Sequence, residues 1–230
     1  MNKILIEVSV GELLDKISIL EIKKEKIKDL DKSKFITDEY LILKKQLDEN
    51  ITLNDELKKL YEELKAINTK LWDIEDNKRM CEKNSDFGEN FIKLSRDVHF
   101  LNDDRAKIKL AINDITGSKI KEIKQNKIKD PEKLKFIENE HSILKSQLDL
   151  NVKKDELLEK LFNSLKEINS KLWVIEDDKR LCEKEKNFGD KFIKLSRDVH
   201  FLNDDRAKIK LEINNHTGSK IKEIKSYTNY

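Results

Sequence analysis

The chain has 230 residues, and its 48 lysines and arginines nearly balance its 46 aspartates and glutamates. This balance argues against a nucleic-acid binder, because such proteins usually gather a basic excess on one face. No apolar run approaches the roughly 20 residues that span a bilayer, and charged residues interrupt the opening segment, where a secretory signal has an apolar core. We therefore expect a cytoplasmic protein with no membrane insertion and no nucleic-acid partner.

The composition favours long solvated helices. Charged residues make up 41% of the chain, and only one proline and five glycines are present to interrupt helices. The two cysteines, Cys81 and Cys182, are too few for a disulfide framework, and we interpret them as small apolar side chains. The predicted fold class is all-α.

The chain opens with an alternating segment and a short helix. Isoleucine and valine occupy every second position of residues 4–10, which favours a short extended segment that must pair with another strand or stay irregular. A helix should begin after Ser9 and Gly11. Its apolar face consists of Leu13, Leu14, Ile17 and Leu20.

Two longer helices follow. The first carries apolar or aromatic residues at Phe35, Tyr40, Leu43 and Leu47. The second has apolar residues at alternating steps of four and three, namely Leu53, Leu57, Leu60, Leu64, Ile67, Leu71 and Ile74. An unbroken heptad seam of this kind requires a partner helix. Asn54 or Thr52 is placed to cap its start.

A turn and a fourth helix supply that partner. Residues 84–88 are typical of a turn, in which Gly88 is free to take a positive φ angle. The helix predicted over about 89–113 has the seam Phe91, Leu94, Val98, Leu101, Arg105, Ile108 and Ile112. Because the connection is short, the third and fourth helices should form an antiparallel hairpin.

The sequence repeats itself at an offset of 101 residues. All 20 residues of 91–110 recur unchanged at 192–211, whereas only 16 of the 33 residues of 35–67 recur at 136–168. We therefore predict two packed helical units, residues 1–118 and residues 119–230. The second unit lacks a counterpart of residues 1–18, and Pro131 is placed in the first turn of one of its helices.

The arginines are the sharpest chemical clue. Lysine is the default cation, with 42 copies, and only six arginines are present. They occupy three positions in each unit, namely Arg79, Arg96, Arg105, Arg180, Arg197 and Arg206. The planar guanidinium binds a carboxylate or a phosphate through two parallel hydrogen bonds, which lysine cannot do. The arginines therefore indicate either a polar packing network or an anion site.

The expected hairpin register predicts partners for these arginines. Arg96 should pair with Glu75 or Asp76 across its own hairpin, and correspondingly Arg197 with Glu176 or Asp177. Arg105 and Arg206 occupy seam positions where an apolar residue is usual, so each needs an acidic partner or a bound anion. Glu21 and its counterpart Glu122 are the leading candidates. Asp15 could serve Arg105, but Thr116 stands at the matching position of the second unit.

These polar residues form the candidate binding site. In the first unit they are Glu75, Asp76, Arg79, Arg96, His99, Asn102, Asp103, Arg105 and Lys109, and in the second Glu176, Asp177, Arg180, Arg197, His200, Asn203, Asp204, Arg206 and Lys210. His99 and Asp103 are too few per unit for a metal site. No nucleophile or phosphate-loop motif is present. We therefore predict no metal, no cofactor and no catalytic residue.

Several segments resemble a small uncharacterised bacterial family. They are VSVGELLDKISILEIKKEKI at 8–27, KLWDIEDNKRMCE at 70–82, DFGENFIKLSRDV at 86–98, NDDRAKIKLAIN at 102–113 and GSKIKEIKSY at 218–227. Members of that family are usually single units, and many are encoded among genes for surface-polysaccharide synthesis. The resemblance implies an intracellular role near sugar metabolism. This chain departs from the pattern because its second unit lacks GELLDK.

The leading functional hypothesis is a non-enzymatic helical protein that recognises an anionic small molecule, such as a nucleotide sugar or sugar phosphate. The alternative is a structural or scaffold protein whose polar cluster only fixes packing. A sugar-modifying enzyme that uses Glu75 or Asp103 with His99 is the third hypothesis. A protein partner or a homo-oligomer is compatible with the first two.

Overall fold

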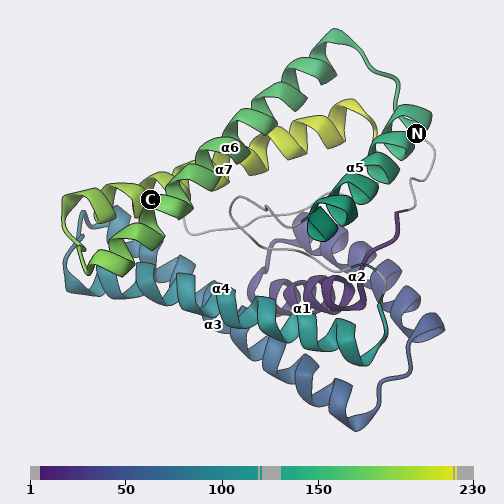
Figure 1. Cartoon of the computed structure of the whole chain (residues 1–230), viewed down its shortest axis with the longest axis horizontal. Coiled ribbons are helices and arrows are strands. Elements are labelled where there is room, and N and C mark those ends of the chain that lie inside the picture. Colours follow the sequence, from purple (N-terminus) through teal and green to yellow (C-terminus); the bar gives the residue numbers. More distant parts are fainter. Residues whose placement is uncertain (1–5, 119, 121–130, 220, 222–230) are drawn as a thin grey trace.

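A computed structural model describes residues 6–118, 120, 131–219 and 221. Within these ranges the chain forms helices and no strand, which confirms the all-α class (Figure 1). The helices are α1 (Val10–Lys26), α2 (Leu30–Asn50), α3 (Asp55–Lys83), α4 (Glu89–Ile115), α5 (Pro131–Asn151), α6 (Glu156–Glu185) and α7 (Asp190–His216). The first residues of α5, α6 and α7 lie 101 positions after those of α2, α3 and α4.

The start of the described chain is irregular rather than extended in a sheet. Residues 6–9 have no regular secondary structure, and Val10 already belongs to α1. The side chain of Ser9 caps this helix by accepting a hydrogen bond from the Glu12 backbone N–H at 3.2 Å. The short extended segment expected at 4–10 therefore does not pair where it is described, and residues 4 and 5 lie outside the described ranges.

Helix α1 is the centre of the first half of the molecule, where it packs against α2, α3 and α4. Leu14 and Leu64 are fully buried in this core, and Ile17 of α1 is 1% exposed. Figure 1 shows α1 enclosed by the other three helices. Burial of several such aliphatic side chains, at about 1.5–3 kcal/mol each, is the main stabilising contribution at this place.

Helices α3 and α4 form one hairpin, and α6 and α7 form another. Asn54 caps α3 as predicted, since its side chain accepts a hydrogen bond from the Leu57 N–H at 2.8 Å. The prediction for Gly88 was wrong, because this residue has φ −72° and lies at the N-cap of α4. Ser85, with φ 53°, takes the left-handed conformation that reverses the chain.

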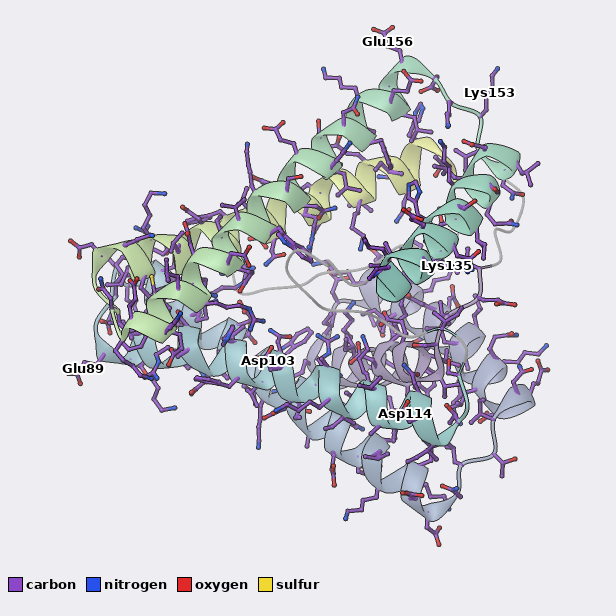
Figure 2. All side chains as sticks on the ribbon, viewed as in Figure 1. Glu89, Asp103, Asp114, Lys135, Lys153 and Glu156 are labelled. Atoms are coloured by element: carbon purple, nitrogen blue, oxygen red, sulfur yellow. The ribbon has the colours of Figure 1, made fainter. Side chains whose placement is uncertain are left out.

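The two hairpins meet at one end and diverge at the other (Figure 1). Figure 2 shows Glu89, at the start of α4, at the end where the hairpins meet, whereas Asp114 and Glu156 lie at the separated ends. Contact between α4 and α7 joins the two hairpins. This junction brings most of the predicted polar residues together.

Candidate functional site: the junction of two hairpins

Arg96 and Arg197 cross from one hairpin to the other. Arg96 donates from Nε and a terminal nitrogen to the two carboxylate oxygens of Glu183, both at 2.8 Å. Arg197 makes the matching contacts with Glu82, at 2.9 and 2.6 Å. The predicted partners were therefore wrong. The arginines do not pair within their own hairpins, because the ends of the hairpins face each other and bring a carboxylate from the opposite unit within reach.

A second set of ion pairs also joins the hairpins. Arg79 donates to both oxygens of Asp204 at 3.0 and 2.7 Å. Arg180 donates to both oxygens of Asp103 at 3.5 and 3.1 Å. The two pairs differ in burial, because the Arg79 side chain is 5% exposed and that of Arg180 is 48% exposed. Burial strengthens such a pair only when both charges remain compensated.

Aromatic rings complete the arginine sites. The guanidinium of Arg96 lies 4.3 Å from the centre of the Phe188 ring, and that of Arg197 lies 4.3 Å from the centre of the Phe87 ring. Each cation is therefore held both by a carboxylate and by the face of an aromatic ring. These two phenylalanines were not predicted as site residues, although they occupy equivalent places one residue before each N-cap glycine.

The contacts across the junction are reciprocal. Adding 101 to the arginine number and subtracting 101 from the carboxylate number gives the counterpart pair: Arg96–Glu183 becomes Arg197–Glu82, and Arg79–Asp204 becomes Arg180–Asp103. Exchange of roles between two equivalent surfaces is characteristic of a two-fold symmetric dimer interface. In such an interface each residue serves both sides, which gives a physical reason for the identity of 91–110 and 192–211.

Buried lysines lie beside the arginines. Lys78 is 2% exposed and its Nζ is 3.4 Å from a carboxylate oxygen of Glu75, while Lys179 is 3% exposed and 3.7 Å from Glu176. Burial lowers the pKa of Lys179. Burial alone would raise the pKa of Glu75, but Lys78 and His200 more than offset this and lower that pKa to about 2.

Replacing Glu75 by glutamine should make the free energy of unfolding depend less on pH in the acid range. The pKa of Glu75 falls from 4.5 to about 2 on folding, so its stabilising effect is present above pH 4.5 and disappears as the pH falls towards 2. Circular dichroism during urea unfolding at a series of pH values measures this. Glu62→Gln, at an exposed position of α3, is the control. An unchanged profile in the Glu75 variant would contradict the expected linkage.

A separate polar network holds α1 on the first hairpin. Arg105 donates to both carboxylate oxygens of Asp15, with Nε at 2.7 Å from Oδ1. Asn68 also donates to Asp15 at 2.9 Å and to the Ser18 hydroxyl oxygen at 2.8 Å. Burial raises the pKa of the Asp15 carboxyl, but Arg105, Asn68 and Lys109 together outweigh burial and keep that pKa below its usual value. Asp15 was the alternative prediction for Arg105.

Glu21, the leading predicted partner of Arg105, lies elsewhere. Its carboxylate forms an ion pair with Lys65 at 2.9 Å, so the predicted pairing of Glu21 with Arg105 was wrong. Its counterpart Glu122 falls outside the described ranges. The reason is helical geometry: Asp15 and Glu21 are six residues apart on α1, and only Asp15 is placed opposite the Arg105 level of α4.

Two further contacts fix the start of α1. Lys109, 5% exposed, donates to Glu12 at 2.6 Å. The Gly11 backbone N–H donates to the Asn113 side-chain oxygen at 2.7 Å. A Cβ atom at position 11 would lie 2.5 Å from the Lys109 carbonyl oxygen, so only glycine permits this close approach.

The second unit holds its arginine differently. Among the residues that the structure describes, no carboxylate pairs with Arg206, whose side chain is half-buried. Thr116, at the position that matches Asp15, belongs to the C-cap of α4. The remaining predicted residues are spread over four helices, α3, α4, α6 and α7. They are Asp76, Asn102, Asp177 and Asn203, all half-buried, and the exposed Lys210.

A histidine also belongs to the ion pairs at the junction. His99 lies 3.4 Å from a terminal nitrogen of Arg180 and 3.8 Å from Asp103, and burial together with Arg180 lowers its pKa.

Across the described part of the chain, no group of three histidine, cysteine or acidic side chains could hold a metal ion. None of the described helices has the length and apolar character needed to cross a bilayer.

Fold and site together define an all-helical protein whose two hairpins are joined by reciprocal arginine–carboxylate pairs. Residues 4–132 match a family of unknown function, DUF6165, and the chain belongs to this family. The matched range contains α1 to α4 and ends at the start of α5. No curated protein and no solved structure matched the chain.

Proposed function

We propose that this protein is a non-enzymatic helical scaffold whose polar cluster sets how its two units pack. The observation that supports this most strongly is the state of the arginines. Five of the six, all except Arg206, already bind both oxygens of a carboxylate within the chain. A guanidinium engaged in this way has its charge compensated and one paired set of donors occupied, so it attracts a phosphate or a carboxylated ligand less strongly.

The cellular setting of this proposal comes from the sequence resemblance alone. We propose a cytoplasmic accessory role near surface-polysaccharide synthesis, in which the protein organises other proteins rather than transforming a sugar. Glu75 and Asp103, the residues considered for acid or base catalysis, are each engaged with a cation. That arrangement favours a structural role for both carboxylates.

Recognition of an anionic small molecule is the second candidate, and one observation favours it. Arg206 is half-buried on α7, and no carboxylate pairs with it among the described residues. A phosphate or a nucleotide sugar would compensate its charge. The second candidate therefore places the anion at Arg206 rather than at the junction.

A thermal-shift measurement separates the two candidates. The scaffold proposal predicts that inorganic phosphate, sugar phosphates and nucleotide sugars leave the melting temperature unchanged at matched ionic strength. Chloride at the same ionic strength is the control for screening. A concentration-dependent rise that the variant Arg206→Leu abolishes would refute the scaffold proposal and support an anion site, because only a ligand that binds the native state raises the melting temperature.

A further inference from the structure

The second hairpin repeats the residues that bind α1 on the first hairpin, and among the described residues no helix packs on it as α1 packs on the first. In the first half, α1 is held through polar contacts of Gly11, Glu12 and Asp15. Their partners on α3 and α4 are Asn68, Arg105, Lys109 and Asn113. The second hairpin has the same residue types at the matching positions, namely Asn169, Arg206, Lys210 and Asn214.

The apolar part of this face is also present. Leu64 and Trp72, which pack against the cores around α1, correspond to Leu165 and Trp173. Tyr61 is replaced by Phe162, which keeps the ring and loses the hydroxyl. Both the charged and the apolar features that bind α1 on the first hairpin therefore recur on the second.

Exposure differs sharply between the two faces. Asn68 is 5% exposed under α1, but Asn169 is an exposed residue. Phe162 and Trp173 are 54% and 52% exposed. These two rings, together with Leu165, Lys166, Asn169 and Ser170, line a groove of about 350 Å³ on α6. Exposed aromatic side chains in a groove are typical of a surface that binds a partner.

Among the described residues, helix α5 lacks the packing partner that its counterpart α2 has. Its counterpart α2 packs on α1 and buries Ile36 and Leu47, which are 1% and 2% exposed. Helix α5 has no extensive contact with another described helix, and it stands apart from α6 and α7 in Figure 1. The counterparts of Ile36 and Leu47 on α5, Ile137 and Leu148, are only half-buried. A helix in the α1 position would give α5 a surface to pack against.

We propose that the groove of the second unit binds, in trans, a helix of another protein chain that has the chemistry of α1. The occupant needs a glycine followed directly by a glutamate, two leucines and an aspartate, as in residues 11–15 of α1. The aspartate complements Arg206, and the glycine allows the close approach seen at Gly11. The chain has one GELLDK segment, already seated on the first hairpin, and two faces for it.

This inference rests on the proposed scaffold function, since it names the class of partner that the scaffold would bind. The geometry of recognition is the helix-in-groove mode, in which one amphipathic helix places its apolar face in a hydrophobic groove. Here the polar contacts would fix where the bound helix lies along the groove, because its aspartate must face the guanidinium of Arg206 to form two parallel hydrogen bonds.

A fluorescent peptide of residues 6–28, blocked at both ends, tests the proposal against the full-length protein by fluorescence anisotropy. We expect saturable binding of one peptide per chain. The peptide variants Asp15→Asn and Gly11→Val should each bind about tenfold more weakly or worse, because the first leaves a charge uncompensated and the second clashes with backbone. The protein variant Arg206→Leu should weaken binding similarly, and Lys208→Ala, at an exposed position of α7, should not.

Three outcomes would overturn the proposal. Absence of saturable binding would do so directly while leaving the scaffold function intact. Binding that is lost in Arg105→Leu but kept in Arg206→Leu would mean that the peptide displaces α1 from the first hairpin. Stabilisation by inorganic phosphate that depends on Arg206, without peptide binding, would make the groove a small-anion site and would count against the scaffold function as well.

Discussion

Replacing Arg79 by methionine should destabilise the protein by about 3–5 kcal/mol, whereas the same replacement at Arg180 should cost less than about 1 kcal/mol. The two residues are counterparts, and each binds both oxygens of an aspartate in the opposite hairpin. Their burial differs, since the side chains of Arg79 and its partner Asp204 are 5% and 19% exposed and those of Arg180 and Asp103 are 48% and 41% exposed.

The loss should be larger at Arg79 because its partner, the Asp204 carboxylate, is poorly solvated. Methionine keeps the apolar stem of Arg79 but leaves the Asp204 carboxylate without its cation in a poorly solvated place. Water compensates Asp103 when Arg180 is changed. Urea unfolding of both variants measures the two free energies of unfolding. Equal losses in the two variants would show that the asymmetry in burial has no energetic consequence, and the interpretation of the junction as partly desolvated would fail.

Replacing Arg105 by leucine should also cost about 3–5 kcal/mol, and a second replacement, Asp15→Leu, should recover most of the loss. Asp15 is 2% exposed and would be left as a buried charge when Arg105 is absent. Without Arg105, burial dominates the pKa of Asp15 and raises it, so the loss should be smaller at acidic pH and larger near neutrality.

The counterpart variant Arg206→Leu is the control for this prediction. Among the described residues no carboxylate faces Arg206, so its replacement should change the free energy of unfolding by no more than about 0.5 kcal/mol. A loss in Arg105→Leu that the double variant does not recover would mean that the arginine stabilises the core by packing rather than by compensating Asp15.

The hairpins could be predicted from the sequence because heptad seams and caps are local signals. Leu57 and Leu64 of the predicted seam are buried in α3, and Asn54 caps that helix. The reversal of the chain was predicted at the right place, but the positive φ angle belongs to Ser85 rather than to Gly88. Non-glycine residues adopt this conformation uncommonly, so the sequence favoured the glycine over Ser85.

The pairing of Arg96 was not predicted because the two units are nearly alike. A carboxylate of the same unit and its counterpart in the other unit look equivalent in the sequence, and a seam specifies only that a helix has a partner. The register within one hairpin indicates Glu75 or Asp76 as the partner and gives no indication of Glu183. One signal was available: Glu82 and Glu183 occupy matching positions of the two units, as Arg96 and Arg197 do.

A double-mutant cycle on Arg96 and Glu183 tests the reciprocal junction most directly. The single variants Arg96→Ala and Glu183→Ala and the double variant should be non-additive by about 1–3 kcal/mol, because residues in direct contact couple and distant ones do not. A parallel cycle on Arg96 and Glu75 of the same hairpin should be additive within about 0.5 kcal/mol. Coupling of Arg96 to Glu75 together with additivity towards Glu183 would contradict a junction in which each hairpin supplies the carboxylates for the arginines of the other.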